Sequence, residues 1–112
     1  MNVTALSPRP GCSEPFRRSR ERFIPESSGC YVLTSVEGTI LYIGLTNALR
    51  RRFREHLDNP EKRAPRPDGR AVLFHWTETS DLNKVERTWL NAHLVNEGNL
   101  PDLNKIYPPV ST

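Results

Sequence analysis

The sequence predicts a single α+β domain, and three observations along its 112 residues support this. Residues 29–43 carry aromatic and β-branched side chains with the two-residue period of strands, interrupted by a turn. Residues 48–57 and 81–97 place apolar side chains at helical spacing. Residues 71–76, between those helices, form a short apolar run typical of a central strand. The length allows one modest hydrophobic core.

The first predicted elements are two strands joined by a tight turn. Tyr31 and Leu33 alternate with their neighbours along the first strand. Glu37-Gly38 supplies the turn, since Gly38 can adopt positive φ, and the strand pattern resumes over residues 39–43. Gly44 is expected to end the second strand. The cysteine at position 30 should face the core.

Residues 48–57 predict the first helix, for which Thr46 or Asn47 would be the N-cap. Arg52 lies at the border of the apolar stripe, so its guanidinium is expected near the packed strands. Taken alone, His56 reads as a core histidine with one hydrogen bond, but its position one turn after Arg52 favours a functional role. The stripe itself contains Leu49, Phe53, His56 and Leu57.

Residues 59–70 contain three prolines and one glycine, which predicts a loop that is mobile or serves binding. Arg63, Arg66 and Arg70 in this loop could grip a phosphate backbone, and a solvated insertion explains them equally well. The loop leads into the central strand.

Residues 81–97 predict the second helix, with Ser80 or Asp81 as N-cap and Gly98 as the stop. Glu86 adjoins its buried stripe. A carboxylate in that position either pairs with an arginine, which is the commoner case, or holds a metal ion.

Residues 1–28 hold four prolines and an arginine-rich cluster between Phe16 and Phe23. A short helix docked by the two phenylalanines, a basic arm that orders on a polyanion, and a partly ordered surface arm all fit, and the prolines favour the last. We therefore divide the chain into an N-terminal basic arm (1–28), a domain (29–106) and a C-terminal tail (107–112).

Basic residues cluster in the middle of the chain. Residues 46–70 hold eight basic against four acidic residues, whereas residues 71–112 hold three against five. Arginines outnumber lysines by thirteen to three, and guanidinium groups bind phosphate oxygens well. The cluster indicates a nucleic-acid partner or an ordinary solvated helix, with equal weight on charge alone. The candidate contacts are Arg50, Arg51, Arg54, Arg63, Arg66 and Arg70.

The composition also bears on the compartment. No run of 18 apolar residues is present, which predicts no membrane span, and the N-terminus has no apolar segment typical of a signal peptide. The two cysteines match no metal-ligand spacing. A cytoplasmic protein is the expectation.

Gly29-Cys30-Tyr31 is followed, after ten residues, by Tyr42-Ile43-Gly44. These two tripeptides resemble the paired signature of the GIY-YIG nuclease family, with cysteine in place of the middle isoleucine. The resemblance covers roughly residues 29–104. The later residues that match the family pattern are Arg52, His56, Glu86 and Asn104.

The resemblance implies a small three-stranded antiparallel sheet flanked by helices. It also implies hydrolysis of DNA phosphodiester bonds with one divalent ion, Mg²⁺ or Mn²⁺, held by Glu86. Tyr31 would accept a proton from the attacking water, with Arg52 and the metal expected to lower its pKa. Arg52 would also stabilise the phosphate.

The resemblance implies supporting roles at the site for the remaining residues. Tyr42 would position the water or a phosphate oxygen, and His56 would hydrogen-bond a tyrosine or the phosphate. Gly29 and Gly44 belong to the signature, and Gly44 would allow backbone and substrate to approach closely. Asn104 reads better as a structural residue that bonds loop backbone. Both tyrosines could also be strand aromatics with hydroxyls that only reach solvent.

Three function classes follow: a metal-dependent DNA endonuclease, a DNA-binding or assembly module on the same fold with little or no catalysis, and a basic protein-interaction domain. The joint presence of both tyrosines, Arg52, His56 and Glu86 favours the endonuclease. DNA is then the expected partner. Target choice would come from DNA structure, a separate specificity partner, a homodimer, or residues 59–70.

Overall fold

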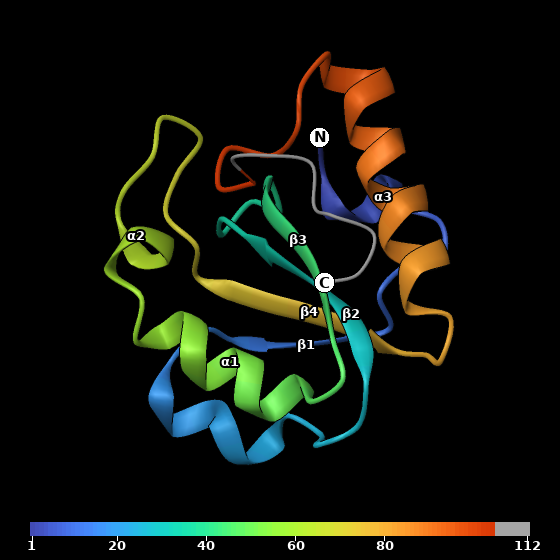
Figure 1. Ribbon diagram of the computed structural model, residues 1–112. Helices are drawn as coiled ribbons and strands as arrows, with labels where there is room; N and C mark the ends of the chain where they lie inside the picture. Colours follow the sequence, from blue (N-terminus) through green and yellow to red (C-terminus); the bar gives the residue numbers. More distant parts are fainter. Residues whose placement is uncertain (105–112) are drawn as a thin grey trace.

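The computed structural model describes residues 1–104 and contains a four-stranded antiparallel sheet with the strand order β1-β4-β2-β3 (Figure 1). The tail predicted at 107–112 and the last two residues of the predicted domain lie outside the described residues. The strands are β1 (Cys12–Pro15), β2 (Gly29–Thr34), β3 (Ile40–Thr46) and β4 (Leu73–Glu78). The helices are α1 (Leu49–Leu57), α2 (Pro60–Arg63) and α3 (Leu82–Glu97), with 3-10 turns η1 (Val3–Ala5) and η2 (Arg18–Phe23).

The predicted α+β class is confirmed, but the predicted number of three strands is wrong. The fourth strand, β1, comes from the proline-containing N-terminal segment and pairs with β4, with Cys12 opposite Trp76. Because β1 is an edge strand and Pro15 is its last residue, the missing proline N–H is tolerated there. The prolines therefore did not exclude a packed element.

The rest of the N-terminal segment is also packed, in contrast to the expected surface arm. Four of its apolar side chains, those of Val3, Leu6, Phe16 and Ile24, are buried. Phe16 meets Phe53 of α1 edge to face, with ring centroids 5.5 Å apart. Residues 1–28 thus contribute to both hydrophobic cores of the molecule.

The sheet carries one core on each face, and β2 forms the centre of both. All six residues of β2 are buried, and alternate side chains point to opposite faces. Tyr31 and Leu33 face α1, whereas Cys30 and Val32 face α3. Figure 1 shows these two helices on different sides of the strands. The expected burial of Cys30 is confirmed.

The two main helices agree with their predicted ranges within one residue. Asp81 holds the predicted N-cap position of α3, although its side chain makes no capping hydrogen bond. No side chain caps α1; its first N–H groups, of Leu49 and Arg50, donate to the carbonyls of Ser27 and Pro25. The hydroxyl of Thr46 accepts only from the backbone of Ala48. Long-range backbone carbonyls therefore take the place predicted for Thr46 or Asn47.

Three further expectations concern turns and ends. Gly38 and Gly98 adopt positive φ of 91° and 79°, as predicted for a turn and a helix stop. The predicted loop 59–70 instead begins with the short helix α2, started by the side chain of Asn59. No helix among residues 1–104 is long and apolar enough to cross a membrane.

Candidate active site

A buried tyrosine lies at the centre of the candidate site. Tyr31 of β2 has no exposed surface, and its hydroxyl lies 2.6 Å from Nε2 of His56 on α1. Nε of Arg52, one helical turn earlier, donates to the same hydroxyl at 3.3 Å. The predicted juxtaposition of Arg52, His56 and the strands is therefore present.

One of the two hydrogen bonds has a fixed direction. Arg52 can only donate, so the Tyr31 oxygen accepts from it. The direction of the bond between Tyr31 and His56 depends on the tautomer of the imidazole. Burial, together with the charges of Arg52 and Lys62, lowers the pKa of His56 to about 3, so the ring is neutral at pH 7.

Burial has the opposite effect on the phenol. It raises the pKa of Tyr31 well above its usual value, and the nearby Tyr42 adds to the shift. Arg52 lowers the pKa but does not outweigh burial. The expected lowering of the Tyr31 pKa by Arg52 is outweighed by burial, and Tyr31 is a neutral phenol. Arg52 stays cationic, because its bonds to Tyr31 and Glu55 raise its pKa despite burial.

Tyr42 of β3 forms the exposed side of this cluster. It is half-buried, and its ring lies 5.1 Å from that of His56 and 6.0 Å from that of Tyr31, centroid to centroid. The Lys62 ammonium of α2 sits over the Tyr42 ring at 4.7 Å from its centroid. A ligand approaching the cluster would meet Tyr42, Lys62 and Arg52 before it reached Tyr31.

The two signature glycines make room for neighbouring groups of the protein. Gly44 pairs with Tyr31 across the strands, and a Cβ there would lie 2.5 Å from the Tyr31 hydroxyl. A Cβ on Gly29 would collide with the carbonyl of Thr77 and with Leu49. Gly44 also lies within β3 and does not end it, contrary to expectation. Its close approach is to Tyr31.

Asn104 has the structural position that was expected. Its side-chain oxygen accepts from the N–H of Ile43, and its amide donates to the carbonyl of the same residue, both at 2.9 Å. These bonds satisfy backbone groups on the free edge of β3, between Tyr42 and Gly44. Asn104 therefore holds the strand that carries the site.

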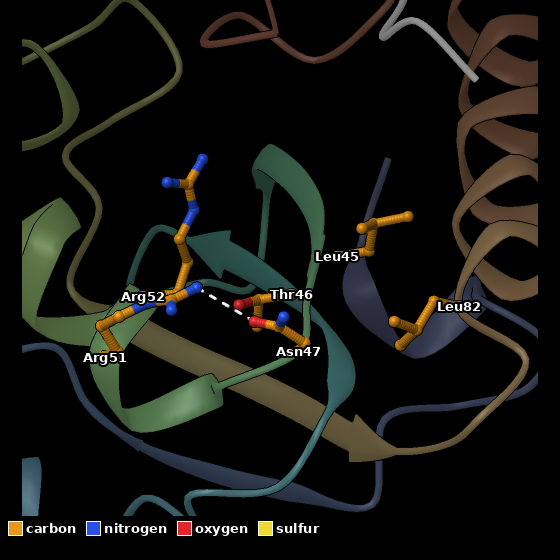
Figure 2. Close-up of a pocket in the computed structure, with 6 residues that line it drawn as sticks. All are labelled: Leu45, Thr46, Asn47, Arg51, Arg52 and Leu82. Carbon is orange, nitrogen blue, oxygen red and sulfur yellow. Dashed lines mark hydrogen bonds between the residues drawn. The ribbon is translucent and has the colours of Figure 1, made fainter. Parts of the chain in front are cut away.

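A pocket of about 390 Å³ opens beside this cluster and passes the edge of β3 (Figure 2). Arg51 and Arg52 line it from α1, and Leu82 lines it from the start of α3. Arg51 donates to Asn47 at 3.0 Å, the bond drawn in Figure 2. The remaining lining residues are Leu45, Thr46 and Asn47. The pocket thus joins the α1 side of the sheet to the α3 side.

Glu86 lies on the α3 side, one helical turn after Leu82. It is only 7% exposed, and burial raises the pKa of its carboxyl. Within residues 1–104, Glu86 forms no ion pair, and no hydrogen bond joins it to Tyr31, Tyr42, Arg52 or His56. The described residues also contain no cluster of three or more His, Cys, Asp or Glu side chains suited to a metal.

The arginines predicted to contact nucleic acid have different surroundings. Arg50 is turned inward and donates to the carbonyl of Ile24. Arg51 and Arg54 are exposed, and Arg54 pairs with Glu21. Arg66 donates to the carbonyl of Asp102, with its Nε buried and unbonded among the described residues. Arg63 and Arg70 line a second pocket.

Two residues at or near the site were missed. Lys62 was placed in a loop, because the prolines around it hid the single turn of helix that aims it at Tyr42. Arg17 was assigned to the arm, yet it lines the same pocket as Arg63 and Arg70. The asparagine-proline start at residues 59–60 was the available signal for α2, since it is a common helix N-terminus.

The comparison with known families agrees with this geometry. A family model described as the GIY-YIG catalytic domain matches residues 27–98, well over half of the chain. The chain belongs to the GIY-YIG family. The match includes the cluster around Tyr31 and ends after α3, so it takes in both helices that line the pocket beside β3.

Individual GIY-YIG relatives match shorter segments. The UvrABC system protein C of Prochlorococcus marinus (strain CCMP1986) is 39% identical over 49 residues, which is 44% of this chain and 8% of the relative. The protein of the same name from Geobacter metallireducens is 44% identical over 41 residues, 37% of this chain and 7% of the relative. The chain therefore corresponds to a small part of these relatives.

Proposed function

We propose that this protein is an endonuclease that hydrolyses phosphodiester bonds in DNA with the help of one divalent metal ion. The observation that carries the proposal is the hydrogen-bonded group of Arg52, Tyr31 and His56 behind the half-exposed Tyr42, beside a pocket lined by two arginines. Family membership and the similarity to UvrABC system protein C support it.

Arg52 is the residue that receives the scissile phosphate. Its Nε and Nη1 are engaged with Tyr31 and Glu55, while its side chain remains 39% exposed, so further N–H groups are free to donate. Attack by water adds negative charge to the phosphate oxygens, and a fixed guanidinium at that point stabilises the transition state. Its raised pKa keeps it charged throughout the working pH range.

Proton removal from the attacking water runs through the tyrosines. Tyr42 positions the water, and Tyr31 accepts its proton once the phenol has lost its own proton to solvent. The charge of Arg52, and that of a metal ion bound with the substrate, would favour the phenolate. His56 is too weak a base to take the proton, and its hydrogen bond holds the Tyr31 hydroxyl in place.

Glu86 is suited to hold a metal ion by the chemistry of its surroundings. Burial raises the pKa of this carboxyl more than the charge of Arg87 lowers it, and Glu86 forms no ion pair among residues 1–104, so a further cation beside it would stabilise the charged form. Mg²⁺ often takes one or two carboxylates and completes its shell with water and phosphate oxygens, so a single carboxylate suffices. The ion would act as a Lewis acid on the leaving 3′ oxygen.

The test is nicking of supercoiled plasmid, with Mg²⁺ and with EDTA. Tyr31→Phe removes only the hydroxyl and should lower the rate by about 100-fold or more. Arg52→Ala should lower it by about 100- to 1,000-fold. Glu86→Ala should match the effect of EDTA on the wild-type protein.

Arg9→Ala is the matched control, because Arg9 is an exposed arginine outside both main helices. Its rate should equal that of the wild-type protein. Full activity of the Tyr31, Arg52 and Glu86 variants would mean that the site lies elsewhere. DNA binding without nicking by the wild-type protein would favour a binding module on this fold.

A further inference from the structure

A second pocket, separate from the one beside β3, is lined by three arginines and three apolar residues. Its volume is about 240 Å³. The arginines come from three segments of the chain: Arg17 after β1, Arg63 at the end of α2, and Arg70 before β4. We call these three residues the arginine triad. Phe16, Ala71 and Val72 complete the lining.

The arginine triad has no counter-charge among residues 1–104, unlike Arg18, Arg20 and Arg54. All three side chains are exposed, and none forms an ion pair or side-chain hydrogen bond within residues 1–104. No acidic residue lines their pocket. The neighbouring pocket between η2 and α1 is different, because its Arg18 and Arg54 are paired with Asp58 and Glu21.

Strand pairing brings the triad together. Pro15 of β1 lies opposite Leu73 of β4, and the N–H of Phe16 donates to the carbonyl of Val72 at 2.8 Å. This pairing brings together the segments just beyond the two strands, and Arg17 and Arg70 of these segments line the same pocket. Three like charges held in one place repel one another unless an anion lies between them.

The short helix α2 connects the arginine triad to the candidate active site. Lys62 lies over the ring of Tyr42, and the next residue, Arg63, lines the triad pocket. Consecutive Cα atoms are about 3.8 Å apart, so α2 presents one cation to each location. A strand of nucleic acid advances about 3.4 Å per nucleotide, so a chain bound at Tyr42 reaches the triad within a few nucleotides.

We propose that the arginine triad binds a backbone phosphate of the nucleic-acid substrate, a few nucleotides from the scissile bond. The inference rests on the proposed function, and it adds a site that includes Arg17. Guanidinium groups suit this ligand because they donate paired N–H groups to phosphate oxygens. Arg66, although close in sequence, is bonded to a backbone carbonyl and does not take part.

The experiment measures fluorescence anisotropy of a short labelled DNA duplex over a range of salt concentrations, in EDTA so that no cleavage occurs. The test variant is Arg17→Gln/Arg63→Gln/Arg70→Gln. The control variant is Arg9→Gln/Arg22→Gln/Lys84→Gln, which removes three exposed cations from other places. Both variants change the net charge equally, so general electrostatics affect them alike.

The test variant should bind the duplex at least about tenfold more weakly than the control variant. Its plot of log affinity against log salt should be shallower by about 0.9 for each phosphate that the triad no longer neutralises. Equal binding by the two variants would overturn the proposal, as would triad-dependent binding of polyglutamate with no triad-dependent binding of DNA.

Failure of the proposed function has a separate readout. If the wild-type protein does not nick plasmid, the endonuclease proposal fails whatever the anisotropy shows. If it nicks plasmid while the test and control variants bind the duplex equally, only the triad proposal fails. Circular dichroism of both variants checks that they fold, and the single variant Arg70→Gln provides the same comparison with less change.

Discussion

Three of the described residues determine the position of the Tyr31 hydroxyl. Arg52 donates to it, His56 is hydrogen-bonded to it, and Gly44 leaves the space that it occupies. The glycine of the second signature tripeptide therefore has a packing role that is specific to the tyrosine of the first. The two tripeptides pair across the strands and need each other.

The change Gly44→Ala tests this dependence. The added Cβ would lie 2.5 Å from the Tyr31 hydroxyl, so the ring must move away from His56 and Arg52. We expect a loss of stability of about 1–3 kcal/mol, as for other overpacked cores, measured by urea denaturation. Nicking should fall in parallel with that of Tyr31→Phe.

Gly11→Ala is the matched control, since no atom lies within 4 Å of a Cβ at that position. Its stability should stay within about 0.5 kcal/mol of the wild-type value. A stable and fully active Gly44→Ala protein would show that the position of Tyr31 does not depend on this glycine.

For single residues, the sequence predicts which side chains are in contact better than it predicts their protonation states. The spacing of Arg52 and His56 on one helix stripe was enough to place both beside the strands, and the structure confirms it. The raised pKa of Tyr31 could not be read from the sequence, because it depends on complete burial beneath α1 and β3. The site roles of these residues remain predictions.

Among the elements, the helices follow their sequence pattern and the first strand does not. Residues 48–57 and 81–97 each have an apolar stripe long enough to specify a helix and the face it buries. β1 has only four residues with no alternating burial, and it becomes a strand through pairing with β4. Whether so short an edge segment forms a strand depends on tertiary pairing, which local propensity does not capture.

Phe16 and Phe23 allow a test of how far this N-terminal segment stabilises the domain. Phe16 is 5% exposed and packs on Phe53, whereas Phe23 is 46% exposed and lies under two arginine side chains. Phe16→Ala should cost about 3–5 kcal/mol in the free energy of unfolding, the usual range for a buried phenylalanine.

Phe23→Ala should cost less than about 1 kcal/mol, since it removes only exposed surface and cation–π contacts. Urea denaturation of both variants gives the comparison. Equal, small losses would mean that residues 1–28 are a surface arm after all, as their prolines first indicated.

For the whole molecule, the central feature is a sheet with a different helix on each face. Arg52 belongs to the α1 face and Glu86 to the α3 face, so a site that uses both must pass the edge of β3. The pocket that contains Arg52 and Leu82 lies at that edge (Figure 2). The side chain of Asn104 hydrogen-bonds the backbone N–H and carbonyl of Ile43 in the same strand, which keeps this edge from pairing with another strand.

A metal ion at Glu86 would therefore join the two layers, and its effect on stability can be measured without substrate. In EDTA, the Glu86→Gln protein should melt at or above the wild-type temperature. Burial disfavours the charged carboxylate, as its raised pKa shows, whereas the amide is neutral.

Saturating Mn²⁺ should reverse this order of melting temperatures. A free ion at 100 times its Kd stabilises the folded state by about 2.7 kcal/mol, which raises the melting temperature of a domain of this size by about 10 °C, and only the wild-type protein should gain it. Glu37→Gln, a change at an exposed carboxylate in the turn between β2 and β3, should leave the Mn²⁺ shift intact. An equal Mn²⁺ shift in the Glu86→Gln protein would place the ion away from Glu86 and would remove the metal step from the proposed reaction.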